Sequence, residues 1–94
     1  MSYRLRFHEK ALREWRALPQ AIREQFKKKL MERLEHPRVP SAALSGMKDC
    51  YKITLRQAGC RLVYRVDDDV LFVSVIAIGR RERLEAYLAA KECL

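Results

Sequence analysis

The chain has 94 residues, 49% of them hydrophobic, and its 20 Lys and Arg against 12 Asp and Glu give a formal net charge of +8. This length and composition allow one hydrophobic core, so we expect a single domain over residues 1–94 and not a disordered basic tail. The longest apolar run, residues 70–78, is far shorter than the roughly 20 residues of a membrane-spanning helix, and no signal peptide is evident. We therefore expect a cytoplasmic protein without a membrane partner.

The first third of the chain predicts one strand followed by two helices. Apolar and basic side chains alternate over residues 3–7, as in a half-buried strand. From residue 8 the apolar spacing becomes helical until Pro19, and a second amphipathic stretch then continues to His36-Pro37. Two short helices joined at Pro19 indicate an antiparallel helical hairpin.

The remainder of the chain predicts a loop over residues 37–49 and then three strands and a helix. A two-residue turn at Ala58-Gly59 would pair Arg56 with Arg61 and place the apolar alternates of residues 51–66 on one face. Residues 70–78 are apolar on both faces, as in a central strand that ends at Gly79, and residues 80–90 have helical spacing. The order predicts an α+β domain with an N-terminal strand, a helical hairpin, an antiparallel sheet of about four strands and a short C-terminal helix.

The positive charge is concentrated in the middle of the chain. Residues 36–66 contain six basic residues and one acidic residue, Asp49. A nearly acid-free basic stretch indicates a polyanionic partner, most commonly nucleic acid. In the predicted register, the open face of the sheet carries Lys52, Arg56, Arg61 and Arg65, next to the arginine-rich segment 80–83.

This basic face suits a phosphodiester, because arginine presents a planar fork of donors to phosphate oxygens. RNA carries its own nucleophile, the 2′-OH. Its cleavage needs a group that takes the proton, donors for the phosphorane charge and an acid for the leaving 5′-oxygen. Without a histidine, Lys52 or Tyr87 would act on the proton, with Arg61 and Arg81 as electrostatic clamps. From such a pattern alone, a binding surface is more frequent than an active site.

The histidines and cysteines do not predict a metal site. We expect His8 and His36 to be structural or solvated, and the three cysteines, Cys50, Cys60 and Cys93, to be reduced thiols. No two cysteines have CxxC spacing, and we expect no metal and no other cofactor.

Five segments together resemble the RelE family of toxins from bacterial toxin–antitoxin pairs. They are residues 11–16, 23–30, 44–53, 59–64, and Gly79-Arg80-Arg81-Glu82-Arg83 followed by Tyr87. Their order and spacing cover nearly the whole chain. The resemblance implies a microbial-RNase-like α+β fold. It also implies a metal-independent, ribosome-dependent endoribonuclease, an mRNA interferase that cuts mRNA in the A site and leaves a 2′,3′-cyclic phosphate and a 5′-OH.

The resemblance also implies roles for particular residues. The residues that match those implicated in cleavage are Lys52, Arg61, Arg81 and Tyr87. Other basic residues are expected to bind mRNA or small-subunit ribosomal RNA: Lys27, Lys28, Lys29, Lys48, Arg56, Arg65, Arg80 and Arg83. A RelB-like antitoxin would wrap the toxin in a heteromeric complex and displace the C-terminal helix that carries Tyr87.

Two departures from the family pattern and two alternative functions stay open. Thr54 stands where the family has a second active-site lysine, so either Lys52 or Tyr87 is the general base or the nuclease is weaker. Ser45 stands where a basic residue is common. The alternatives are a ParE-like toxin that inhibits DNA gyrase and a non-catalytic basic RNA-binding module; Arg61, Arg81 and Tyr87 favour the RelE branch.

Overall fold

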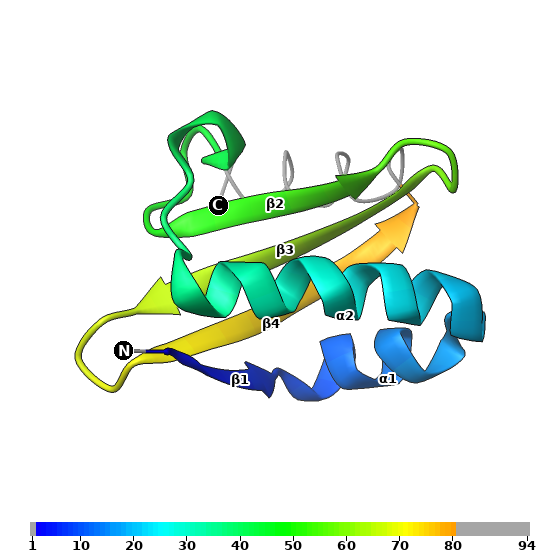
Figure 1. The fold of residues 1–94 in the computed structure, drawn as a ribbon, viewed down its shortest axis with the longest axis horizontal. Helices are drawn as coiled ribbons and strands as arrows, with labels where there is room; N and C mark the ends of the chain where they lie inside the picture. The colour runs from blue at the N-terminus through cyan, green and yellow to red at the C-terminus, as the bar shows by residue number, and fades with distance from the viewer. Residues whose placement is uncertain (1, 81–94) are drawn as a thin grey trace.

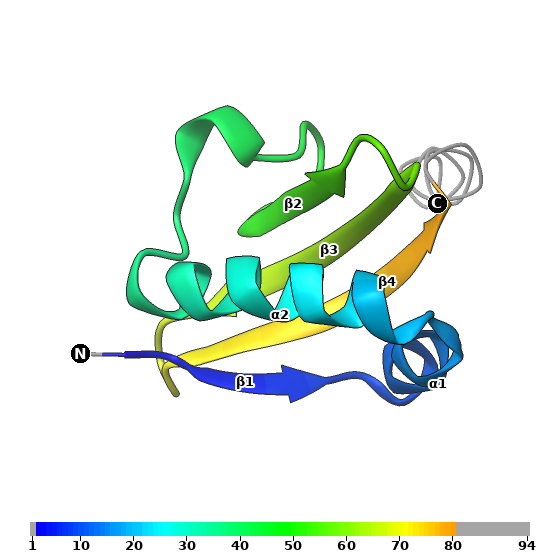
Figure 2. The ribbon, with the colours of Figure 1, turned by 45° about the vertical axis from the view of Figure 1, so that its right-hand side comes forward.

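The computed structural model describes residues 2–80, which form a two-layer α+β fold (Figure 1). The elements are β1 (Arg4–Phe7), α1 (Glu9–Ala17), α2 (Gln20–Glu35), a short 3₁₀ helix η1 (Pro40–Ala42), β2 (Cys50–Leu55), β3 (Cys60–Asp67) and β4 (Phe72–Arg80). Both α-helices lie on the same face of a four-stranded sheet of order β1-β4-β3-β2 (Figures 1 and 2). Neither is long and apolar enough to cross a membrane. The predicted C-terminal helix falls outside the described residues, except Arg80, which ends β4.

The sheet is mixed at one edge, where we expected a fully antiparallel sheet. β2–β3 and β3–β4 are antiparallel, but β1 pairs in parallel with β4, with Arg4 opposite Phe72 and Phe7 opposite Val75. A tight hairpin enforces antiparallel pairing, whereas β1 continues directly into α1 and no hairpin links it to β4. The two predicted helices are confirmed. Their axes cross: in Figure 2, α1 is seen end-on, whereas α2 runs across the view.

The loop between β2 and β3 has four residues, 56–59, and not the two that we predicted. Leu55 pairs with Cys60 and Thr54 with Arg61, so the register differs by two residues from the predicted one. Because side chains alternate with a period of two, an even shift leaves each strand residue on its predicted face. The correction therefore changes the cross-strand neighbours, and it moves Arg56 from the strand into the loop.

The main hydrophobic core lies between the helices and the sheet. From α2, Phe26 and Leu30 are at most 1% exposed, as the four-residue apolar spacing predicted. The inward side chains of the sheet that pack in this core are Tyr51, Ile53, Leu55, Cys60, Leu62, Tyr64, Val66, Val73, Val75 and Ile78. Trp15 of α1 packs on Phe7 of β1, with ring centroids 5.2 Å apart. Because burial of these apolar side chains is strongly favourable, the core determines which face of the sheet packs against the helices and which face lies opposite them.

β4 is central, as predicted, but it does not end at Gly79. Its register with β3 changes between Val63 and Tyr64, which face Ala77 and Val75, so Ile76 is the extra residue of a β-bulge. This bulge explains why residues 70–78 showed no apolar alternation. The strand continues through Gly79, which pairs with Arg61, and ends at Arg80.

A polar network ties the N-terminus to the β3–β4 turn and to the loop before β2. The Tyr3 hydroxyl donates to Asp68, and the Arg38 guanidinium donates to Asp68, to Asp49 (3.0 Å) and to the Tyr51 hydroxyl (3.2 Å). The Tyr3 hydrogen bond and then Arg38 hold the pKa of Asp68 below its ordinary value of 3.8. This network closes the end of the sheet at which the 37–49 loop returns to β2.

Substitution of Asp68 by Asn tests this network. The depressed pKa means that the carboxylate contributes stability above pH 3.8, and that this contribution is lost as the pH falls through the folded-state value. We expect Asp68→Asn to lower the urea midpoint at pH 7, and the two midpoints to converge as the pH falls below 3.8. Asp69→Asn, in the same turn, is the control. A difference that stays constant to low pH would contradict a role for the charge.

Candidate functional site

The sheet face opposite the helices carries three rows of side chains across β2, β3 and β4. The rows are Cys50–Arg65–Ser74, Lys52–Val63–Ala77 and Thr54–Arg61–Gly79. Lys52 and Arg61 lie diagonally on neighbouring strands, a spacing of about 7–8 Å between backbones that long side chains span. The structure therefore brings these two predicted catalytic residues together on one face.

Arg61 is the most enclosed cation of this face. It is 7% exposed, whereas Arg65, two residues along the same strand, is exposed. On the β4 side its neighbour is Gly79, where an added Cβ would meet no atom of the described residues within 4 Å. A charge largely removed from water interacts more strongly with an anion than a solvated one. Arg61 is thus well placed to bind a phosphate oxygen.

Lys52 is half-buried beside a small second hydrophobic cluster on the open face. This cluster consists of Cys50, Val63 and Ala77, with Leu44, Met47 and Ile76 packed against it. The fully buried Val63 lies directly opposite Lys52. The lysine therefore has an apolar row as its cross-strand neighbour, and the row of Arg61 is the next one along the strands.

The other predicted nucleic-acid-binding residues divide into two groups. Arg65 is exposed on the open face, and Lys48, Arg56 and Arg80 are exposed in the adjoining loops or at the end of β4. Lys27, Lys28 and Lys29 are exposed on α2, in the opposite layer, and the structure does not bring them near Lys52. Arg81, Arg83 and Tyr87 lie outside the described residues.

Arg6 also belongs to the open face, although the sequence did not predict it there. Its Nε donates to Ser74 Oγ at 2.7 Å, and its guanidinium lies 4.3 Å from the ring centroid of Phe72 and 3.7 Å from Asp67. The alternation of residues 3–7 placed Arg6 on the polar side of its strand. Only the parallel pairing with β4, which the sequence did not predict, aligns it with the row of Arg65. Asp67 offsets part of its charge.

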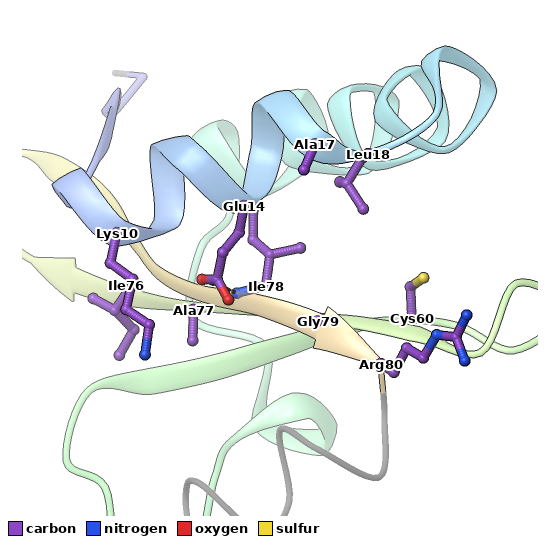
Figure 3. A pocket seen from close by; sticks show the side chains of 10 residues that line it. All are labelled: Lys10, Glu14, Ala17, Leu18, Cys60, Ile76, Ala77, Ile78, Gly79 and Arg80. Carbon is purple, nitrogen blue, oxygen red and sulfur yellow. Dashed lines mark hydrogen bonds between the residues drawn. The ribbon is translucent and has the colours of Figure 1, made fainter.

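A cavity of about 460 Å³ lies at the other edge of β4, next to α1 (Figure 3). Apolar side chains form most of its wall, and Lys10, Glu14, Cys60 and Arg80 also line it. The Glu14 carboxylate accepts a hydrogen bond of 3.2 Å from the Ile78 amide, at a position on the strand edge that β1 does not reach. Glu14 thus closes a sheet edge, and the cavity includes neither Lys52 nor Arg61.

The open face has the chemistry of a phosphodiester site. Its three rows contain cations, hydroxyls, the Cys50 thiol and small apolar side chains, and the carboxylate of Asp67 lies beyond them, at the end of β3 where it is paired with Arg6. Across residues 2–80, no three His, Cys, Asp or Glu side chains cluster as metal ligands would. Arg61 can stabilise negative charge that develops on a phosphorane, and Lys52 can donate to or accept from a ribose hydroxyl.

The chain is similar to known toxins over nearly its whole length. Residues 5–85 match the family model described as the ParE toxin of the type II toxin-antitoxin system parDE. The mRNA interferase toxin RelE of Escherichia coli (strain K12) is 56% identical over 90 residues, which cover 96% of this chain and 95% of that relative.

Solved structures show the same relationship. A double arginine-to-alanine mutant of E. coli toxin RelE in the free state superposes with a TM-score of 0.87 at 53% identity, and the match covers 100% of both chains. The intact E. coli RelBE toxin-antitoxin complex contains a chain that matches with a TM-score of 0.82 at 54% identity, covering 84% of this chain and 96% of that one. The chain therefore belongs to the RelE/ParE family of type II toxin–antitoxin toxins.

Proposed function

We propose that this chain is the toxin of a toxin–antitoxin pair and an mRNA endoribonuclease, and that it cuts mRNA in the A site of translating ribosomes in the cytoplasm. The observation that carries the proposal is the shared open face of Lys52 and Arg61, in a fold that matches RelE over its full length. The E. coli relative at 56% identity is named an mRNA interferase.

The reaction needs only the RNA and protein side chains. The ribose 2′-OH gives up its proton as its oxygen attacks the adjacent phosphorus, and the bond to the 5′-oxygen breaks as that oxygen takes up a proton, so the products are a 2′,3′-cyclic phosphate and a 5′-OH. Arg61 stabilises the phosphorane charge, and Lys52 positions or deprotonates the 2′-OH. By sequence resemblance alone, Arg81 adds a second clamp, and Tyr87 stacks on the RNA or exchanges a proton with it.

The partners of this toxin are a RelB-like antitoxin, the ribosome and mRNA. A solved structure that matches this chain is titled as the intact RelBE toxin-antitoxin complex, which supports a protein partner of the same kind here. The net charge of +8 suits both ribosomal RNA and an acidic antitoxin segment. We assign the toxin to one domain over residues 1–94.

Gyrase inhibition is the second candidate, because the matching family model is named after the ParE toxin. Primer extension on a translated message after induction of the toxin separates the two activities. In-frame cuts in the A site support the interferase. Intact mRNA together with a DNA-damage response would instead support gyrase inhibition, and salt-sensitive RNA binding without either effect would support a binding module.

Removal of Arg61 or Lys52 should abolish most of the cleavage. We expect Arg61→Met and Lys52→Met each to slow single-turnover cleavage on ribosome complexes by about 10²-fold or more, because removal of one group that stabilises transition-state charge costs about that factor. Arg13→Met, an exposed substitution on α1, is the control. Cleavage at the unaltered rate by either site variant would exclude that residue from the reaction.

Thr54→Lys tests whether the absence of a cation at position 54 limits the rate of cleavage. Thr54 lies directly opposite Arg61, so a lysine there would direct a second ammonium group toward the same phosphate. We expect cleavage to be several-fold faster, at a cost of roughly 0.2–1 kcal/mol in unfolding free energy from the like charges. Thr54→Met is the matched control. An unchanged rate in the lysine variant would show that the remaining residues already supply the chemistry.

A further inference from the structure

Arg33 connects α2 to the backbone of Lys52. Its Nη1 donates to the Lys52 carbonyl oxygen at 3.3 Å and to the Tyr64 hydroxyl at 2.8 Å. Its guanidinium carbon lies 5.8 Å from the centroid of the Tyr64 ring. Arg33 comes from the helical layer, whereas the Lys52 side chain is on the open face. The contact therefore reaches the candidate active site from behind the sheet.

The Lys52 carbonyl lies on the outer edge of β2, which is the last strand of the sheet. Along this edge the loop before β2 makes one bridge, Ala43 with Tyr51, and the Leu44 amide donates to the Cys50 carbonyl. The Lys52 carbonyl is the next one that points outward. An edge strand has a full hydrogen-bonded ladder on one side only. A donor on its other side, at the Lys52 carbonyl, therefore restrains the backbone that carries the lysine.

Arg33 is itself held in place by Tyr64, whose hydroxyl group both donates and accepts a hydrogen bond. Tyr64 is 0% exposed, and its hydroxyl donates to the Pro37 carbonyl at 2.6 Å while it accepts from Arg33. Burial raises the pKa of Tyr64. Tyr64 also stacks on Tyr51, with centroids 5.7 Å apart, and Arg38 donates to the Tyr51 hydroxyl. The guanidinium of the partly buried Arg33 is thus held by groups that are themselves packed in place.

We propose that Arg33 is a positioning residue, which holds the β2 backbone so that the Lys52 ammonium group meets the ribose of the bound RNA. The inference rests on the proposed function. Misplacement of a reacting group by about 1 Å can reduce a rate by about 10²-fold. One lost anchor on an edge strand has a smaller effect, because the ladder with β3 still holds Lys52.

The experiment combines two substitutions in a double-mutant cycle. Arg33→Met keeps most of the side-chain length and removes every donor, and Arg33→Lys restores a cationic donor. Each is made with Lys52 present and in the Lys52→Met background, and Arg13→Met is the matched surface control. Single-turnover cleavage of mRNA on ribosome complexes gives the maximal rate and the half-saturating ribosome concentration for each variant. Far-UV circular dichroism and urea unfolding verify the fold.

We expect Arg33→Met to lower the maximal rate about 10-fold with an unchanged half-saturating concentration, and Arg33→Lys to recover most of that loss. In the Lys52→Met background, Arg33→Met should change the residual rate by less than twofold. The same loss in both backgrounds, or a raised half-saturating concentration, would overturn the proposal. If Arg33→Met does not fold, Arg33→Gln takes its place in the same cycle. Absence of cleavage by the unaltered protein would instead overturn the proposed function.

Discussion

The two faces of β3 determine the rest of this structure. Leu62, Tyr64 and Val66 are buried against the helices, and the residues between them, Arg61, Val63 and Arg65, point to the other side. Exposure of the first set to water would cost roughly 1.5–3 kcal/mol per fully buried side chain. The hydrophobic core therefore fixes the register of β3 against both neighbours, and this register places Arg61 beside Lys52. Among the described elements, α1 and α2 lie on the other side of the sheet from Lys52 and Arg61, but their packing determines which side chains this face carries.

The alternation of apolar and polar residues along the strands was enough to predict which side chains lie on this face. The period of two in residues 51–66 was sufficient to place Lys52, Arg61 and Arg65 together. The predicted register was wrong by two residues, but an even shift leaves each strand residue on its predicted face. The pairing of Thr54 with Arg61 was not predictable, because it depends on the length of the loop between β2 and β3. This loop has four residues, and the buried pair Leu55 and Cys60 flanks it.

Non-local contacts account for the other differences. Nothing in residues 3–7 specifies a parallel strand, because its direction follows from how α1 packs on β4. The bulge at Ile76 lies where β4 contributes side chains to two clusters, one under the helices and one around Val63, so it too depends on contacts between distant segments. Arg33 was even less accessible to sequence reasoning. It occupies a position of α2 that looks like ordinary solvated charge, and its acceptors belong to β2 and β3.

Several acidic residues of the described chain are bound at an end or an edge of the sheet, away from Lys52 and Arg61. Asp49, Asp67 and Asp68 are bound to Arg38 and Arg6, at the end of the sheet where the loops meet. Glu14 is bound to a strand edge next to α1. None of these acidic residues lies in the rows of Lys52 and Arg61, and the Arg6–Asp67 pair lies at the far end of the same face. Lys52, Arg61 and Arg65 bring positive charges onto neighbouring strands of one face, and like charges at such positions repel. A polyanion brings compensating negative charge to these cations, so their grouping on one face favours the binding of RNA that we propose.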